Sequence, residues 1–375
     1  MRHFTIITGV SIICAVLLAG GISYSAPDIP AIRDAKDSAE RDRIKALIDG
    51  AQKEKRLDWV GLFIEPSHSE QIITGFKEYY GLPDLKCNYT YGMGADIIGR
   101  VTQTLEGGRT PPDILWMVAW DWYVDLMKRG KLMRYDSPYY EECTFSHKAG
   151  LSMPGYWVSD SYTNMPLWNK KALEKMGINN FNPSSWSDFV DPRLPPLTSL
   201  GNLANPTTNA PWGIAMRRVM GDEWFVKLAK GKAVPFEKAG QAETWLASGE
   251  YPICLNMRIK YAQSLEKSGV EVRWLWPKEG QVMVPFALSI LASAAHPNTA
   301  KLFVDYVRSA RGAEKMASTG VMLVYARPGV KVPEQERKYW PTDEMKVIPF
   351  DYDKDLTREA VRAFNSWAKK IGIGH

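Results

Sequence analysis

Residues 57–81 constrain the fold more than any other stretch, because they read as a strand, a turn and a helix in immediate succession. The apolar run 59–64 is typical of a strand that is buried on both faces. After the turn at 65–69, apolar residues recur at helical spacing over 72–80, and Gly81 ends the helix. This is half of a βαβ unit, in which the turn faces a crevice and the helix presents free N–H groups there.

The same pattern repeats twice in the next part of the chain. A strand is expected at 86–91 with a helix over 97–105, and a third strand at 114–119 precedes a helix that ends at Lys128. Three successive strand-then-helix units without a long loop predict an α/β fold with a doubly wound parallel sheet.

The first 25 residues read as a secretory signal peptide. Arg2 and His3 precede an apolar run over 4–18, and Ser23 and Ser25 occupy the −3 and −1 positions of a cleavage site near Ser25. The alternative is an uncleaved anchor, for which the apolar run is short. Cleavage leaves about 350 residues, which favours two lobes over one core.

Charge and cysteine content narrow the function classes. Loss of Arg2 lowers the net charge from +5 to +4, and no Lys/Arg cluster is present, so neither nucleic acid nor a membrane surface is expected as a partner. Cys87, Cys143 and Cys254 lack metal or redox spacing. They could form one disulfide, for example Cys87 with Cys143, or be buried thiols.

Beyond residue 138 the pattern changes. The aromatic, turn-rich segment 153–169 suits a crossing between lobes, and the proline-rich segment 182–211 reads mostly as loop. A second crossing is expected within 282–292. The remaining expected elements are helices at 212–230, 238–248, 258–267, 298–309 and 355–370, and strands at 252–255 and 270–276.

Seven segments in this order resemble the extracellular solute-binding proteins that feed ABC importers, in the class that includes ferric-ion, thiamine and phosphonate binders. They are GADIIGRVTQTLEGGRTPPDIL (94–115), RGKLMRYDSP (129–138), SWSDFVDPR (185–193), NPT (205–207), ASGEYPICL (247–255), AAHPNTAKLFVDYVRSARGAEKMASTG (294–320) and RPGV (327–330). The resemblance covers nearly all of the mature chain.

The resemblance implies a two-lobed periplasmic-binding-protein fold of type II, with two doubly wound sheets joined by a two-crossing hinge. One lobe would comprise 26–156 and 284–375, and the other 157–283. It also implies a monomer in the periplasm that closes on a ligand in the inter-lobe cleft and delivers it to an ABC permease in the inner membrane. It implies no cofactor.

One departure from the resembled family concerns the ligand. Its iron-binding members use neighbouring tyrosines just after the strand matching 252–255, whereas this chain has Asn256, Met257 and Arg258 there. A permanent cation repels Fe³⁺ and offers no ligand, so no metal is expected, and iron is kept as the alternative. A second departure is Trp168 before Asn169, where many relatives have a tyrosine.

The preferred ligand is a small organic anion, because Arg258 has a planar fork of donors for a carboxylate, phosphonate or sulfonate. The other candidate contacts are Ser67, His68, Ser69, Gly94, Ala95, Trp120, Asp121, Trp157, Thr207 and Thr208. Several have a structural alternative: a surface salt bridge for Arg258, helix N-caps for Ser67, Ser69 and Asp121, solvent exposure for His68, and core packing for the tryptophans.

Catalysis is not expected. The glycines at 92, 94 and 99 miss the dinucleotide-binding spacing, and the sequence has no P-loop or nucleophile elbow. The histidines that remain after cleavage show no metalloenzyme spacing. A ligand sensor for a membrane receptor stays open beside uptake, because both need only closure on a ligand.

Overall fold

The computed structural model describes residues 28–62, 64–92, 94–148, 150–204, 209–320, 327–339, 345–349, 351, 354–355 and 357–373. The expected signal peptide, Thr207 and Thr208 lie outside these residues. In the part of the chain that the structure describes, no helix combines the length and apolar character needed to cross a membrane.

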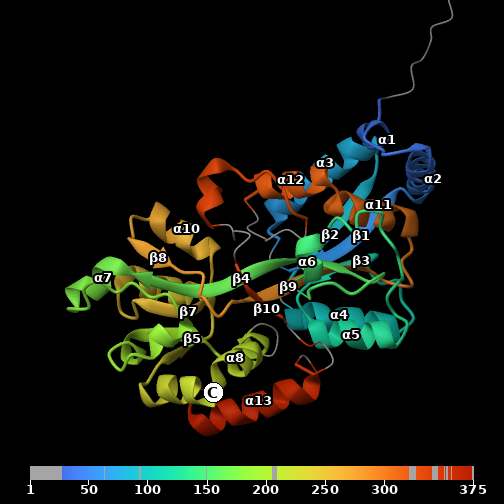
Figure 1. Ribbon diagram of the computed structural model, residues 1–375. Helices are drawn as coiled ribbons and strands as arrows, with labels where there is room; N and C mark the ends of the chain where they lie inside the picture. Colours follow the sequence, from blue (N-terminus) through green and yellow to red (C-terminus); the bar gives the residue numbers. More distant parts are fainter. Residues whose placement is uncertain are drawn as a thin grey trace, which may run out of the picture.

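Figure 1 shows two lobes, with β4 (Val158–Asn169) and β9 (Gln281–Ile290) running between them. The first lobe contains α1 (Pro30–Arg33), α2 (Ser38–Glu54), β1 (Arg56–Gly61), α3 (Pro66–Tyr80), β2 (Lys86–Tyr91), α4 (Gly94–Glu106), β3 (Ile114–Met117), α5 (Trp120–Lys128), α6 (Thr144–Lys148), α11 (Pro297–Arg308) and α12 (Ala310–Ser318).

The second lobe is built from the middle of the chain. It contains α7 (Lys170–Lys175), the 3-10 turns η1 (Trp186–Val190) and η2 (Pro195–Leu197), β5 (Thr198–Gly201), α8 (Asn209–Lys230), β6 (Val234–Phe236), α9 (Ala239–Ser248), β7 (Ile253–Arg258), α10 (Lys260–Lys267) and β8 (Val272–Trp274). The last elements of the chain are η3 (Glu334–Tyr339), β10 (Val347–Ile348) and α13 (Arg358–Ile371).

The strands follow the order β2-β1-β3-β9-β4-β7-β5-β6, with β10 beside β9 and β8 beside β4. β1 is parallel to β2 and to β3, and β5 is parallel to β6 and to β7. β4 pairs with β9 along 158–163 and then with β7 and β8 along 164–169. The segment expected to be an irregular crossing is therefore one continuous strand that belongs to both sheets.

Local sequence explains how the first helices begin and end. The Asp37 side chain accepts a hydrogen bond from the N–H of Glu40 and so caps α2. Gly81 ends α3 with a φ of 64°, a left-handed conformation that glycine adopts without steric cost. At the end of α2, the Glu54 carboxylate accepts hydrogen bonds from Asn298 and Thr299, which holds the start of α11 against α2.

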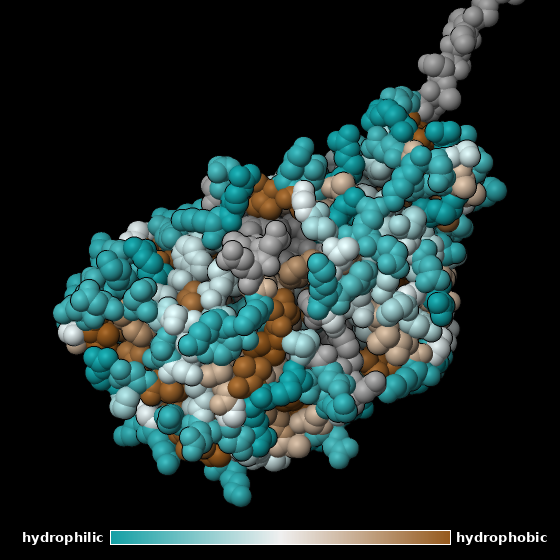
Figure 2. Space-filling view, viewed as in Figure 1, coloured by the Kyte–Doolittle hydropathy of each residue, from teal (hydrophilic) through white to brown (hydrophobic). Residues whose placement is uncertain are grey.

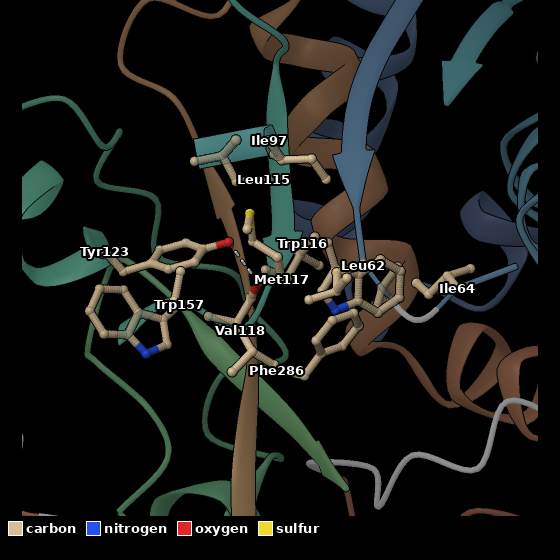
Figure 3. Packing of buried hydrophobic residues seen from close by; sticks show 14 of the residues in the cluster. Leu62, Ile64, Ile97, Leu115, Trp116, Met117, Val118, Tyr123, Trp157 and Phe286 are labelled. Carbon is tan, nitrogen blue, oxygen red and sulfur yellow. Dashed lines mark hydrogen bonds between the residues drawn. The ribbon is translucent and has the colours of Figure 1, made fainter. Parts of the chain in front are cut away.

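The first-lobe core is largely aromatic. Trp59 of β1 packs against Trp116 of β3 and Phe303 of α11, with ring centroids 5.8 and 5.3 Å away. Figure 3 shows Trp116 and Phe286 of β9 in the same cluster, and the Tyr123 hydroxyl, which donates a 3.0 Å hydrogen bond to the carbonyl of residue 287. This packing fixes β9 and α5 to the parallel sheet.

The three cysteines in the described part of the chain are free thiols, so the disulfide considered between Cys87 and Cys143 is not formed. Cys143 and Cys254 are buried and Cys87 is half-buried. Burial raises the pKa of the Cys87 and Cys143 thiols to about 11, which keeps both protonated at neutral pH.

The end of the chain packs on the second lobe, whereas the prediction placed 284–375 in the first. Phe364 of α13 is buried against Phe225 of α8, and a Cβ on Gly213 would collide with its ring. Arg217 of α8 lies over the ring of Trp367, 3.9 Å from its centroid. In Figure 1, α13 runs alongside α8 and reaches toward the first lobe.

We expect Phe364→Ala to lower the free energy of unfolding by about 3 to 5 kcal/mol, because it leaves a cavity between α13 and α8. Urea denaturation followed by circular dichroism measures this. Met176, which is 46% exposed, gives the control: Met176→Ala should change stability by less than about 0.5 kcal/mol. Equal stability of the two variants would show that α13 contributes nothing to the second lobe.

Candidate functional site

Three helices of the first lobe begin at one edge of its sheet. α3 follows β1, α4 follows β2 and α5 follows β3, and these strands are parallel, so their carboxyl ends meet at the same edge. The predicted contacts at 67–69, 94–95 and 120–121 are therefore brought together at the place where α/β sheets bind ligands. Ala95 and Trp120 are described here by their backbone alone.

The start of α3 differs from the expectation for its two serines. Glu65 is the N-cap residue, and neither Ser67 nor Ser69 caps the helix. Ser69 is buried, and its hydroxyl donates a 2.7 Å hydrogen bond to the carbonyl of Pro66, while Ser67 is exposed. His68 is half-buried, and within the described residues its Nδ1 atom has no hydrogen-bond partner.

In the second lobe, β7 ends at Arg258 and α10 begins two residues later with Lys260 and Tyr261. The Arg258 guanidinium donates a 3.0 Å hydrogen bond to the Tyr261 hydroxyl and lies 5.3 Å from the centroid of that ring. Lys260 is half-buried. Two cations thus lie two residues apart at the end of one strand.

The two groups of residues lie within electrostatic reach of each other across the lobes. Burial lowers the pKa of His68 below its usual 6.5, Glu65 opposes this shift and Lys260 adds to it. The pKa of Lys260 is lowered by burial and by Arg258, against the influence of Glu65 and Glu243. Residues of both lobes therefore influence the electrostatics of this region.

Tyr91 completes the first-lobe side of this site. It is 41% exposed, which is high for a large aromatic residue in this protein. Its hydroxyl lies 3.4 Å from a Glu65 carboxylate oxygen, and burial and Glu65 raise its pKa while Arg258 lowers it. An exposed phenol beside cations offers both a ring face and a hydrogen-bond donor to a bound molecule.

Sequence reasoning missed Glu65, Tyr91, Lys260 and Tyr261. Lys260 and Tyr261 come two and three residues after Arg258, and Tyr91 ends the second predicted strand, so the rule that selected His68 would have found all three. Nothing in the sequence shows that α3 and α10, about 190 residues apart, lie near each other; that depends on how the lobes pack.

Two predicted contacts pack against residues outside the group around His68 and Arg258. Trp157 is buried in the first-lobe core beside Tyr123, six residues before β4 passes to the second sheet, which is about 20 Å along a strand. Asp121 lies in the first turn of α5, whose N-cap residue is Ala119, and its carboxylate lies 3.6 Å from the guanidinium of Arg358 on α13. Neither Trp157 nor Asp121 belongs to the group of residues around His68 and Arg258.

A second cluster of polar side chains lies at the opposite edge of the first sheet. Asp58, Asp113 and His296 have ligand-type atoms within 4.8 Å of one another. Both Asp113 oxygens accept hydrogen bonds, one from the His296 backbone N–H and the other from the His296 ring and the Asp58 N–H. These bonds fasten the start of α11 to β1 and β3, which is a structural role.

Figure 2 shows that hydrophilic side chains cover most of one face of both lobes, with a hydrophobic strip near the middle. Among the described residues, the exposed large apolar side chains are Tyr91 in β2, Met176 just after α7 and Val219 in α8, so they form no common patch.

Comparison with known proteins identifies the family. Residues 69–321 match the family described as bacterial extracellular solute-binding protein, which is more than half of the chain. The chain belongs to this family. An uncharacterized protein of Haemophilus influenzae is 24% identical over 312 residues, which cover 81% of this chain and 87% of that protein.

Solved structures of periplasmic binding proteins share the fold of this solute-binding protein. AfuA from Actinobacillus pleuropneumoniae, solved with fructose-6-phosphate bound, is 18% identical with a TM-score of 0.65, over 84% of this chain and 98% of its own. Iron-bound HitA from Pseudomonas aeruginosa has the same identity and TM-score, over 84% and 99%. The fold is thus the type II periplasmic-binding-protein fold, as the sequence predicted.

The electrostatic contact between the lobes of this solute-binding protein is testable without a ligand. We expect Lys260→Gln to raise the pKa of His68, because it removes a positive charge that disfavours the imidazolium. An NMR titration of the His68 ring measures this. Lys267→Gln, at the exposed other end of α10, is the control, and equal His68 pKa values in the two variants would contradict the influence of Lys260 on His68.

Proposed function

We propose that this periplasmic solute-binding protein of the ABC transporter family captures a small organic anion between its lobes and delivers it to the permease. The observation that carries the proposal is the pair of cations, Arg258 and Lys260, which lies within electrostatic reach of His68 and Tyr91 on the other lobe. An anion placed there interacts with groups from both lobes, so it stabilises their closure.

The chemistry of the site supports an anionic group more than a neutral one. Arg258 can bind a carboxylate, phosphonate or phosphate through two parallel hydrogen bonds. Lys260 is half-buried near the cation Arg258, and a bound anion relieves the repulsion between these two positive charges. The fructose-6-phosphate bound to AfuA is an anion of this kind held by the same fold.

Ferric ion is the second candidate, because His68, Glu65, Tyr91 and Tyr261 supply imidazole, carboxylate and phenol groups and iron-bound HitA shares the fold. Arg258 and Lys260 oppose this reading, since each would repel Fe³⁺. The Tyr261 hydroxyl already accepts a hydrogen bond from Arg258. The anion is therefore preferred.

The test is a thermal-shift screen of residues 26–375 with fructose 6-phosphate, an alkyl phosphonate, an organic sulfonate, citrate, ferric citrate and a neutral sugar. A ligand at 100 times its dissociation constant adds about 2.7 kcal/mol of stability. We expect an anion to raise the melting temperature. Stabilisation by ferric citrate without a response to citrate would contradict the anion and support iron.

We expect Arg258→Ala to weaken binding of that anion by about 1.5 to 3 kcal/mol, because a charged hydrogen-bond partner is lost. Isothermal titration calorimetry measures the difference. Arg273→Ala is the matched control, since Arg273 lies in the same lobe and pairs with Glu271 on the surface. Equal affinity of the Arg258 variant and the wild type would remove Arg258 from the site.

Anion affinity should rise as the pH falls from 7.5 to 5.5. Burial holds the pKa of His68 below 6.5 in the free protein, and a bound anion beside the ring raises it, so binding takes up a proton between the two values. The titration uses an organic sulfonate, which does not itself ionise in this range. His68→Gln should flatten the profile, and an unchanged slope would place the anion away from His68.

A further inference from the structure

The chain returns to the second lobe after α12 and contacts α10 there. α12 packs on α3 in the first lobe, and Arg327 still forms an ion pair with Glu142 of that lobe. Twelve residues later, Tyr339 is 3% exposed and lies in the second-lobe core with residues of β7, α10 and β8. The segment Arg327–Tyr339 therefore connects the lobes in addition to β4 and β9.

Tyr339 and Lys338 hold one side chain of α10. The Tyr339 hydroxyl and the Lys338 ammonium both donate hydrogen bonds to the same carboxylate oxygen of Glu266, in the last turn of α10. The Tyr339 ring packs on Trp274 of β8, with centroids 5.1 Å apart. Burial and the bond to Glu266 raise the pKa of Tyr339 to about 12, so it remains a donor at neutral pH.

The opposite end of α10 carries Lys260 and Tyr261 of the candidate site. Glu266 lies six residues further on, about 9 Å along the helix. Ala262 and Leu265, on the buried face of α10, share their core cluster with Tyr339. A helix of eight residues moves as one body, so a shift at Glu266 shifts Lys260 as well.

We propose that Lys338 and Tyr339 are positioning residues for the ligand site: they hold α10 through Glu266, and so set where Lys260 and Tyr261 stand relative to the first lobe. The role in ligand binding rests on the proposed function, whereas the positioning of α10 by these two residues does not. Because Arg327 ties the same segment to the first lobe, α10 is held from both lobes.

The variants that test this preserve packing. Tyr339→Phe keeps the ring on Trp274 and removes the hydroxyl donor, and Glu266→Gln keeps the shape of the acceptor and removes its charge. Glu174→Gln, which breaks an exposed ion pair with Lys170 on α7, is the matched control. The double variant Glu266→Gln with Tyr339→Phe shows whether the two residues act through one contact.

The first readout is the pKa of His68 in the ligand-free protein, measured by NMR. We expect both single variants to raise it as Lys260→Gln does, the double variant to raise it no further, and Glu174→Gln to leave it unchanged. A fall in melting temperature without any change at His68 would show a structural role only and overturn the proposal, as would strictly additive effects.

The second readout is the dissociation constant for whichever probe anion stabilises the wild type, fructose 6-phosphate first. We expect each single variant to weaken binding about tenfold, or about 1.4 kcal/mol. Unchanged affinity in both variants would overturn the proposal. If no anion binds the wild type, the proposed ligand fails, while the His68 measurement still decides whether Tyr339 positions α10.

Discussion

β4 forms hydrogen bonds in the sheets of both lobes, and the position of one lobe relative to the other depends on this strand. Its first half is held by the first lobe: Arg308 of α11 forms a 2.8 Å ion pair with Asp160, and the two side chains are 2% and 1% exposed. Such a buried pair is costly to break, because either partner alone would be an uncompensated charge. The strand's register shifts between Met165 and Leu167, around Pro166, which lacks an N–H. Regular pairing is therefore weakest just beyond the point where β4 leaves the first sheet.

The candidate site combines charged groups from both lobes. Arg258 and Lys260 stand together on the second lobe, and Glu65 and His68 on the first. Each lobe alone exposes its part of this set to water, where such interactions are weak. Under the proposed function, closure brings these groups together, removes water and strengthens each pairwise interaction. The residues proposed to recognise the ligand would then also determine how favourable closure is.

The first lobe could be predicted from the sequence because each of its strands β1, β2 and β3 is followed at once by a helix with clear periodicity. The strand expected over 86–91 is β2 without change, and the helix expected over 298–309 is α11 to within a residue at each end. β5 was missed inside a segment taken as loop, since four residues between prolines carry no periodicity. β10 was missed because two residues form a strand only where β9 supplies the partner.

The candidate site, too, could be predicted from the sequence only in part. His68 and Arg258 follow strands, so the sequence could select them, but the interaction between α3 and α10 and the course of the chain after α12 depend on contacts between distant segments. Tyr339 carries no local signal at all; its role comes from lying beside Trp274 and Glu266. Pairings of this kind are set by tertiary packing and have no signature within a window of sequence.

The packing of α13 on α8 has a practical consequence. Pro30 at the start of α1 belongs to the first lobe, whereas Ile371 at the end of α13 lies on the second, so these two positions sit on different lobes. Under the proposed function, a pair of fluorophores attached at these positions would report lobe closure through energy transfer. The protein thus already has the arrangement that an optical biosensor needs, with no insertion into either lobe.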